Sequence, residues 1–161
     1  MLSNRPIRRI ALLGLLGLAG CGFAPIYGDG GATQGVFAFE TDESIFGFRL
    51  RARLEDRLGQ PSSERFVVKA SIDASERAAA ITEDGDTSRL NVIGAANWSL
   101  TDLETNQQIE TGKIEAFTSY SATGSTVATQ TAKDDARARL ATILADMIVT
   151  RVLLATSGRP L

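Results

Sequence analysis

Residues 66–75 read Phe-Val-Val-Lys-Ala-Ser-Ile-Asp-Ala-Ser, and the alternation in this stretch decides the fold class of the chain. The even positions hold the apolar or small side chains Phe66, Val68, Ala70, Ile72 and Ala74, whereas most odd positions are polar. Because successive side chains of a β-strand point to opposite faces, this pattern predicts a strand with one buried face and one exposed face.

Two later segments share this pattern, and they predict an antiparallel meander with the first strand. Residues 89–102 contain the apolar side chains Leu90, Val92, Trp98 and Leu100. Residues 109–120 alternate again, with Ile114 and Phe117 as the clearest expected core side chains. Polar residues between the segments predict the connecting turns.

An amphipathic helix is predicted at residues 43–58, after a short strand at residues 36–41. Thr41 or Asp42 is the expected N-cap, and Gly59 is expected to end the helix. The apolar stripe recurs every three or four residues and consists of Gly47, Leu50, Leu54 and Leu58.

A second helix is predicted from Val127 or Ala132 to Leu154. The fourteen residues 118–131 include eight Ser or Thr residues, and they predict a loop before this helix. The stripe expected to face the core consists of Ala136, Leu140, Ile143, Leu144, Met147, Ile148 and Val152.

The resulting order β-α-β-β-β-α predicts an α+β fold, in which a four-stranded mixed or antiparallel sheet has two helices packed on one face. The 161 residues are enough for one domain. We expect residues 35–156 to form that domain and residues 157–161 to be a frayed tail.

Residues 1–20 predict a lipoprotein signal peptide. Arg5, Arg8 and Arg9 form a basic start, and the apolar run at residues 10–18 is too short to span a membrane. Leu18-Ala19-Gly20-Cys21 then resembles a bacterial lipobox, in which the thiol of the cysteine receives diacylglycerol. A plain secretory signal and a buried N-terminal helix with an incidental cysteine are the alternatives.

Cleavage before Cys21 would make it an N-palmitoyl and S-diacylglycerol cysteine. Several acyl chains form a stable membrane anchor, since each buried CH₂ contributes about 0.8 kcal/mol. Gly22 rather than Asp follows the cysteine, which by resemblance to enteric lipoproteins favours the outer membrane. Residues 21–34 would then be the lipidated cysteine and a flexible, glycine-rich tether.

The composition argues against most catalytic and nucleic-acid-binding classes. The chain has no His and one Cys, so the commonest general base and the cysteine-rich metal sites are excluded. Without residues 1–20, 14 basic and 19 acidic residues give a net charge of −5, unlike a phosphate-binding surface. We expect no enzyme activity, no cofactor, no metal and no nucleic-acid partner.

Several segments of the chain resemble the alphaproteobacterial lipopolysaccharide (LPS) assembly lipoproteins, the LptE family. The resemblance rests on the combination of residues 21–28, 48–59, 119–123, 127–129 and 135–140. It covers essentially the whole mature chain, and the order of elements agrees with it.

The resemblance implies an outer-membrane lipoprotein that plugs the large LptD-like β-barrel of LPS transport. Such a protein assists barrel assembly and the insertion of LPS into the outer leaflet, and family members have also been assigned direct LPS binding. Two alternatives stay open from the residues alone: a periplasm-facing lipoprotein adaptor, and a lipid-binding shuttle of another envelope transport system. The shuttle would need an internal apolar cavity, whereas a plug would have a polar outer sheet face.

Arg89 and Lys113 are the candidate contacts for LPS phosphates, because both are basic residues on predicted strands near turns. The alternative is that both are exposed charges that keep the domain soluble. No other residue is singled out for ligand binding.

Overall fold

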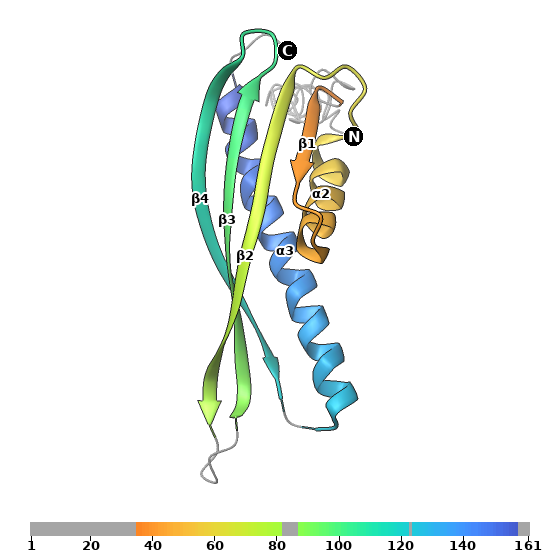
Figure 1. The fold of residues 1–161 in the computed structure, drawn as a ribbon, viewed down its shortest axis with the longest axis vertical. Helices are drawn as coiled ribbons and strands as arrows, with labels where there is room; N and C mark the ends of the chain where they lie inside the picture. The colour runs from red at the N-terminus through yellow and green to blue at the C-terminus, as the bar shows by residue number, and fades with distance from the viewer. Residues whose placement is uncertain (1–34, 82–86, 123, 158–161) are drawn as a thin grey trace, which may run out of the picture. The chain divides into compact units, whose positions relative to one another are not determined.

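The computed structural model describes residues 35–81, 87–122 and 124–157, which form a four-stranded sheet with two helices on one face (Figure 1). Cys21, the tether at 21–34 and residues 158–161 of the predicted tail lie outside the described residues. The elements are β1 (Phe37–Thr41), α2 (Ile45–Leu58), β2 (Phe66–Ile81), β3 (Thr87–Asp102), β4 (Gln107–Ser121) and α3 (Thr126–Thr156). The predicted order β-α-β-β-β-α is confirmed.

The sheet is mixed, and its strand order follows the sequence, β1-β2-β3-β4. β1 pairs with β2 in parallel, and the other two pairings are antiparallel. A parallel pair cannot be joined by a tight turn, and α2 provides the connection that crosses between β1 and β2. β1 pairs with β2 only over Phe66–Ala70, which leaves the rest of β2 without a neighbour on that side among the described strands.

The N-cap of α2 is Ser44, and neither predicted residue occupies that position. The Ser44 hydroxyl accepts a hydrogen bond from the Gly47 N–H at 3.0 Å. Asp42 instead stabilises the turn before the helix, where its carboxylate accepts from the Ser44 N–H at 3.0 Å. Gly59 follows the helix with φ +88° and bonds to the Glu55 carbonyl, so the predicted end is confirmed.

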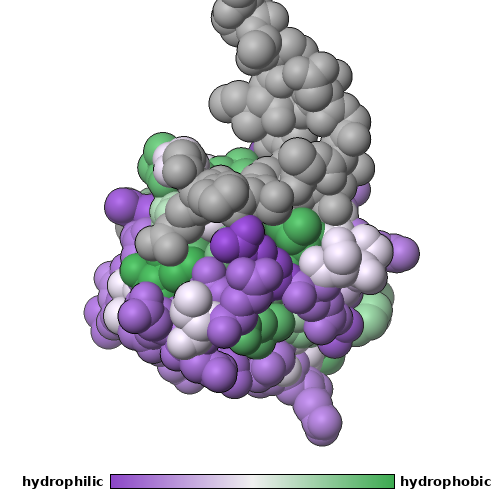
Figure 2. All heavy atoms as spheres, turned by 90° about the horizontal axis from the view of Figure 1, so that it is seen from above, coloured by the Kyte–Doolittle hydropathy of each residue, from purple (hydrophilic) through white to green (hydrophobic). Residues whose placement is uncertain are grey.

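The described surface is mainly hydrophilic, and Figure 2 shows it from above with separate hydrophobic patches. On the outer face of the sheet, the register places polar side chains in rows across neighbouring strands. One row consists of Glu40, Lys69, Ser99 and Thr111, and the next consists of Ser71, Asn97 and Lys113.

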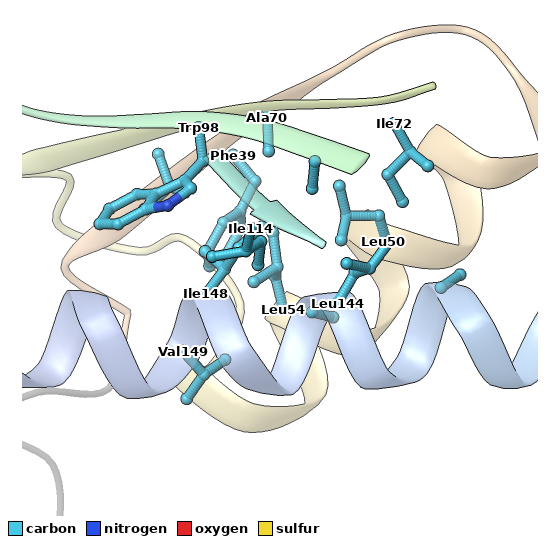
Figure 3. Close-up of a cluster of buried hydrophobic side chains, with 14 of the residues drawn as sticks. Phe39, Leu50, Leu54, Ala70, Ile72, Trp98, Ile114, Leu144, Ile148 and Val149 are labelled. Atoms are coloured by element: carbon cyan, nitrogen blue, oxygen red, sulfur yellow. The ribbon is translucent and has the colours of Figure 1, made fainter. Parts of the chain in front are cut away.

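The core lies between the inner face of the sheet and the two helices (Figure 3). The predicted α2 stripe is buried, and Leu50 and Leu54 are fully enclosed. Phe37 stacks on Phe66 with ring centroids 5.5 Å apart. Trp98 of β3, Ile114 of β4 and Ile148 of α3 belong to the same buried cluster, so these three elements meet in the core.

α3 is longer than the sequence predicts, and the predicted stripe members that are buried are Ala136, Leu140, Leu144, Ile148 and Val152. It begins at Thr126, so most of the Ser/Thr-rich segment at 118–131 belongs to β4 or to the helix. Ile143 and Met147 are 40% and 38% exposed, because the buried face is centred on the small residues Ala141 and Ala145. The full buried set is Ala136, Leu140, Ala141, Leu144, Ala145, Ile148, Val149, Val152 and Thr156.

Two predicted core side chains are exposed. Phe117 is 64% exposed, because it has the opposite strand parity to the inward-facing Ile114 and lies beside Ile93 on the outer face. Ala74 has the inward parity but is exposed, since α2 begins at Ile45 and covers only the half of the sheet that contains β1 (Figure 1). Whether an inward-facing side chain of a strand is buried therefore depends on how far the covering helix extends, as well as on the alternation of the strand.

Candidate functional site

The structure does not bring Arg89 and Lys113 together. Both lie on the outer face, Arg89 opposite Ser121 and Lys113 eight residues earlier along β4. At about 3.3 Å per residue the two positions are about 26 Å apart, so they cannot hold one phosphate between them. They remain two separate candidate contacts.

Lys113 and Arg89 also differ in their electrostatic surroundings. The Lys113 Nζ atom lies 2.7 Å from the Glu115 Oε1 atom, and both side chains are exposed. The hydrogen bond and charge of Glu115 raise the pKa of Lys113 above its usual value, with a further contribution from the charge of Asp73. Arg89 forms no ion pair with another residue of the ranges 35–81, 87–122 and 124–157.

A hollow of about 480 Å³ lies on the outer face of the sheet, next to the end of β1. Polar and charged side chains line it, including Glu40, Lys69 and Asn97. The Lys69 Nζ atom lies 2.7 Å from the Glu40 Oε2 atom across the parallel pair. This hollow is open and polar, which suits contact with a hydrated or polar surface.

A second hollow, of about 390 Å³, has a mostly apolar lining and lies where α2 begins. Its lining residues are Ile45, Phe46, Arg49, Asp134 and Arg137. Ile45 is 77% exposed, and Phe48 in the same helical turn is 74% exposed. We call this hollow the α2 groove.

An adjoining hollow of about 210 Å³ shares Phe46 and Arg137 with the α2 groove. The sheet side of this smaller hollow is formed by Ala74, Ser75, Glu76 and Val92. The two neighbouring hollows border the uncovered half of β2 and the start of α2, and we call them together the inner depression.

Glu76 is the electrostatic centre of this depression. Its carboxylate lies 2.9 Å from both the Lys133 Nζ atom and an Arg137 guanidinium nitrogen of α3. The Tyr120 hydroxyl of β4 donates a hydrogen bond to it at 3.1 Å. Burial opposes ionisation, but the bonds from Lys133 and Tyr120 and the nearby positive charges lower the pKa of Glu76.

The composition of the Glu76 cluster could have been read from the sequence. Glu76 continues the inward-facing even positions of residues 66–74, and Lys133 and Arg137 are four residues apart on one helix face. An inward carboxylate needs a cationic partner, and this helix supplies two. The cluster was not predicted, because the predicted strand ended at residue 75, one position before Glu76.

A second ion-pair cluster joins the two helices. The Asp146 carboxylate of α3 accepts hydrogen bonds from Arg53 at 3.0 Å and from Arg57 at 3.1 Å, both of α2. These side chains are each about one-third exposed, so the cluster orients the helices with a modest free-energy contribution.

Neither a metal-binding group nor a membrane-spanning helix is found in the described part of the chain. Within residues 35–81, 87–122 and 124–157, no group of three or more acidic, His or Cys side chains is arranged to hold a metal ion. None of the helices described here combines the length and hydropathy of a membrane-spanning helix.

Comparison with known proteins gives a family match over most of the chain. The family model described as LptE, lipopolysaccharide-assembly, matches residues 35–152. No curated protein is similar enough to the chain to give a significant match.

Solved structures of bacterial lipoproteins share the fold at low sequence identity. A structure from Caulobacter crescentus described as a lipoprotein has a TM-score of 0.61 at 22% identity, covering 76% of this chain and 89% of that one. Rare lipoprotein B from Shewanella oneidensis has a TM-score of 0.54 at 14% identity, covering 73% and 97% of the two chains. Lipoprotein B from Nitrosomonas europaea has a TM-score of 0.56 at 10% identity, covering 78% and 90%.

Proposed function

The chain belongs to the LptE family of lipopolysaccharide-assembly proteins, and from this membership we propose that it is an outer-membrane lipoprotein that plugs the β-barrel of LPS transport. In this role it helps to assemble an LptD-like barrel and assists the insertion of LPS into the outer leaflet. The role needs a shape and a surface rather than catalysis, and we propose that the chain is not an enzyme.

The polar outer face of the sheet is the observation that carries the plug proposal. The interior of a large outer-membrane barrel is polar, so a domain that fills it must present polar side chains. The outward rows across β1 to β4 do this, with Ser71, Asn97 and Ser99 at their centre. Ile93 and Phe117, which lie opposite each other, are apolar exceptions on this face.

Cys21 is the proposed attachment point to the membrane. As a triacylated N-terminus it would hold the domain at the outer membrane through residues 22–34. Substituting Cys21→Ser should abolish labelling with radioactive palmitate and release the domain from the membrane pellet into the soluble fraction. Palmitate incorporation in the Cys21→Ser variant would contradict this assignment.

The plug proposal is tested by extracting outer membranes with detergent and isolating the chain through a C-terminal tag. Mass spectrometry should identify a large β-barrel protein in a one-to-one ratio that survives washing. Recovery of lipid or soluble proteins without a barrel would contradict the proposal.

The α2 groove favours a second candidate, a lipid-binding shuttle or a periplasm-facing adaptor of another transport system. Its apolar lining and its two arginines suit an anionic amphiphile. The discriminating measurement is the lipid content of the purified chain. Stoichiometric bound lipid in a preparation free of any barrel would favour the shuttle, and a soluble transport component in its place would favour the adaptor.

Arg89 and Lys113 stay proposed contacts for LPS phosphates, now at two separate points of the outer face. We expect Arg89→Gln to reduce LPS retained by the immobilised chain more than Lys113→Gln does, since Glu115 already neutralises Lys113. Glu110→Gln is a matched control on an exposed or half-exposed part of β4. Equal retention by all three variants would remove both residues from the site.

A further inference from the structure

The open edge of β2 below the end of β1 is a place where the sheet is incomplete. β1 ends at Thr41 opposite Ala70, whereas β2 continues to Ile81. No described strand pairs with β2 on this side beyond Ala70. The open edge of β2 therefore runs from after Ala70 to the end of the strand at Ile81, and no described strand pairs with it there.

The backbone groups that face this edge can be assigned from one hydrogen bond. The Ile72 N–H donates to the Asp42 Oδ2 atom at 3.4 Å, so Ile72 directs its backbone toward the β1 side. Alternate residues of a strand direct their N–H and C=O groups to the same side. Ala74, Glu76 and Ala78 therefore present backbone donors and acceptors to the open edge, up to the irregularity after Ala78.

Asp42 marks where pairing by the chain itself ends. Its carboxylate accepts the hydrogen bond from the Ile72 N–H that the backbone carbonyl of Asp42 would accept if β1 continued in the same register. The pKa of Asp42 is lowered, since bonds from Ser44, Ile72 and Gly47 outweigh the effect of burial. Within the part of the chain that the structure describes, Asp42 thus satisfies the first edge group, and no strand pairs with the following ones.

The walls beside the edge are suited to alternate side chains of an added strand. On the inner side lie the smaller hollow and the α2 groove, which share Phe46, and Ile45 also lines the α2 groove. Arg49 borders the groove and has no ion-pair or hydrogen-bond partner among the described residues. An apolar side chain and an acidic one on the same face of a strand match this lining.

We propose that the β2 edge at Ala74–Ala78 accepts an extended segment of the barrel partner as a fifth strand. A row of backbone N–H and C=O groups is matched by another peptide backbone, and the depression beside it selects an apolar and an acidic side chain. This inference rests on the proposed function, because it names the segment by which the barrel polypeptide is held.

The first test is amide hydrogen exchange of the full-length chain, alone in detergent and in the isolated barrel complex. The amides of Ala74, Glu76 and Ala78 should exchange rapidly in the free chain and about tenfold or more slowly in the complex. Protection already present in the free chain would overturn the proposal. If that protection did not depend on protein concentration, residues 22–34 of the same chain would be the segment paired with the edge. If it increased with concentration, a second copy of the chain would occupy the edge. Equal exchange in the free and complexed chain would also overturn it.

The second test removes one edge donor. Ala74→Pro deletes an N–H that faces the open edge and should leave the β2–β3 pairing intact, since proline is tolerated on strand edges. The barrel recovered with the tagged chain should fall about tenfold. Ala74→Ser is the matched control, because it changes the side chain at the same position and keeps the backbone N–H, and it should retain the barrel.

The outcomes separate this inference from the proposed function. A barrel recovered equally with wild type and with folded Ala74→Pro would overturn the strand addition and leave the plug role intact. Wild type without any barrel would overturn both. Thermal unfolding shows whether Ala74→Pro folds, and if it does not, the exchange measurement on the wild-type complex decides.

Discussion

Gly47 is a residue whose importance is set by its surroundings and not by its helix propensity. A Cβ atom at this position would overlap the backbone carbonyl oxygen of Asp42, because the turn before α2 folds back onto the helix. Alanine normally stabilises a helix by about 1 kcal/mol relative to glycine. Here the overlap involves backbone that also holds the Asp42 carboxylate near Ile72, so it is not easily relieved.

Gly47→Ala should therefore lower the free energy of unfolding by about 1–3 kcal/mol, despite the gain in propensity. Urea denaturation followed by circular dichroism measures this change. Arg49→Ala on the exposed side of the same helix is the control and should stay within about 0.5 kcal/mol of wild type. A Gly47→Ala variant as stable as wild type would show that the turn relaxes freely.

At the scale of the strand, alternation determines the cost of a substitution more than residue type does. Ile114 is 9% exposed and Phe117 is 64% exposed, although both are large and apolar and they are three residues apart. Ile114→Ala should cost about 2–4 kcal/mol because it opens a cavity beneath α3. Phe117→Ala should change the unfolding free energy by less than about 0.5–1 kcal/mol. Similar losses for the two variants would contradict the observed strand parity.

The Glu76 cluster joins three elements, β2, β4 and α3, and should make stability depend on pH. The pKa of Glu76 is lower in the folded chain than in the unfolded one, so its contribution is present above about pH 4.5 and is lost as the pH falls through the folded value. Wild type should lose stability in this range, and Glu76→Gln should lack that part of the change. Denaturation curves between about pH 3 and pH 7 check this, with the exposed Glu104→Gln as control.

The elements and most of their buried side chains could be predicted from local patterns, but the exposure of several side chains could not. The stripe of α2 and the strands follow from periodicities of 3.6 and 2, which depend on nearby residues only. Phe117 was misplaced because a large apolar residue was preferred over strict parity. Ile143 and Met147 were misplaced because the sequence does not show that alanines allow α3 to approach the sheet closely.

The close approach of α3 to Gly94 of β3 is another feature that the sequence does not show. A Cβ atom there would lie 2.8 Å from Leu140 Cδ2, so α3 packs directly against the backbone of β3. The candidate site was equally hidden, because the α2 groove arises from the difference between the lengths of α2 and β2. Arg89 and Lys113 could be found from their charge, but their separation follows only from the register.

At the scale of the whole molecule, the polarity of the outer face should matter for partnership and not for folding. Ser71 and Asn97 are opposite each other on that face. The double variant Ser71→Leu with Asn97→Leu should unfold within about 1 kcal/mol of wild type, since no core contact changes. Its recovery of the barrel should fall severalfold, because leucines replace polar contacts with a polar lumen. Undiminished recovery would indicate that another face meets the barrel.

The position of α3 as the last described element has a consequence for biogenesis. Until those 31 residues have been delivered, strands β1 to β4 have only α2 to shield their inward side chains. A polypeptide that emerges N-terminus first would therefore expose Trp98, Leu100 and Ile114 until α3 has followed them. We expect such an intermediate to be prone to aggregation, so truncation before residue 126 should yield an aggregating product.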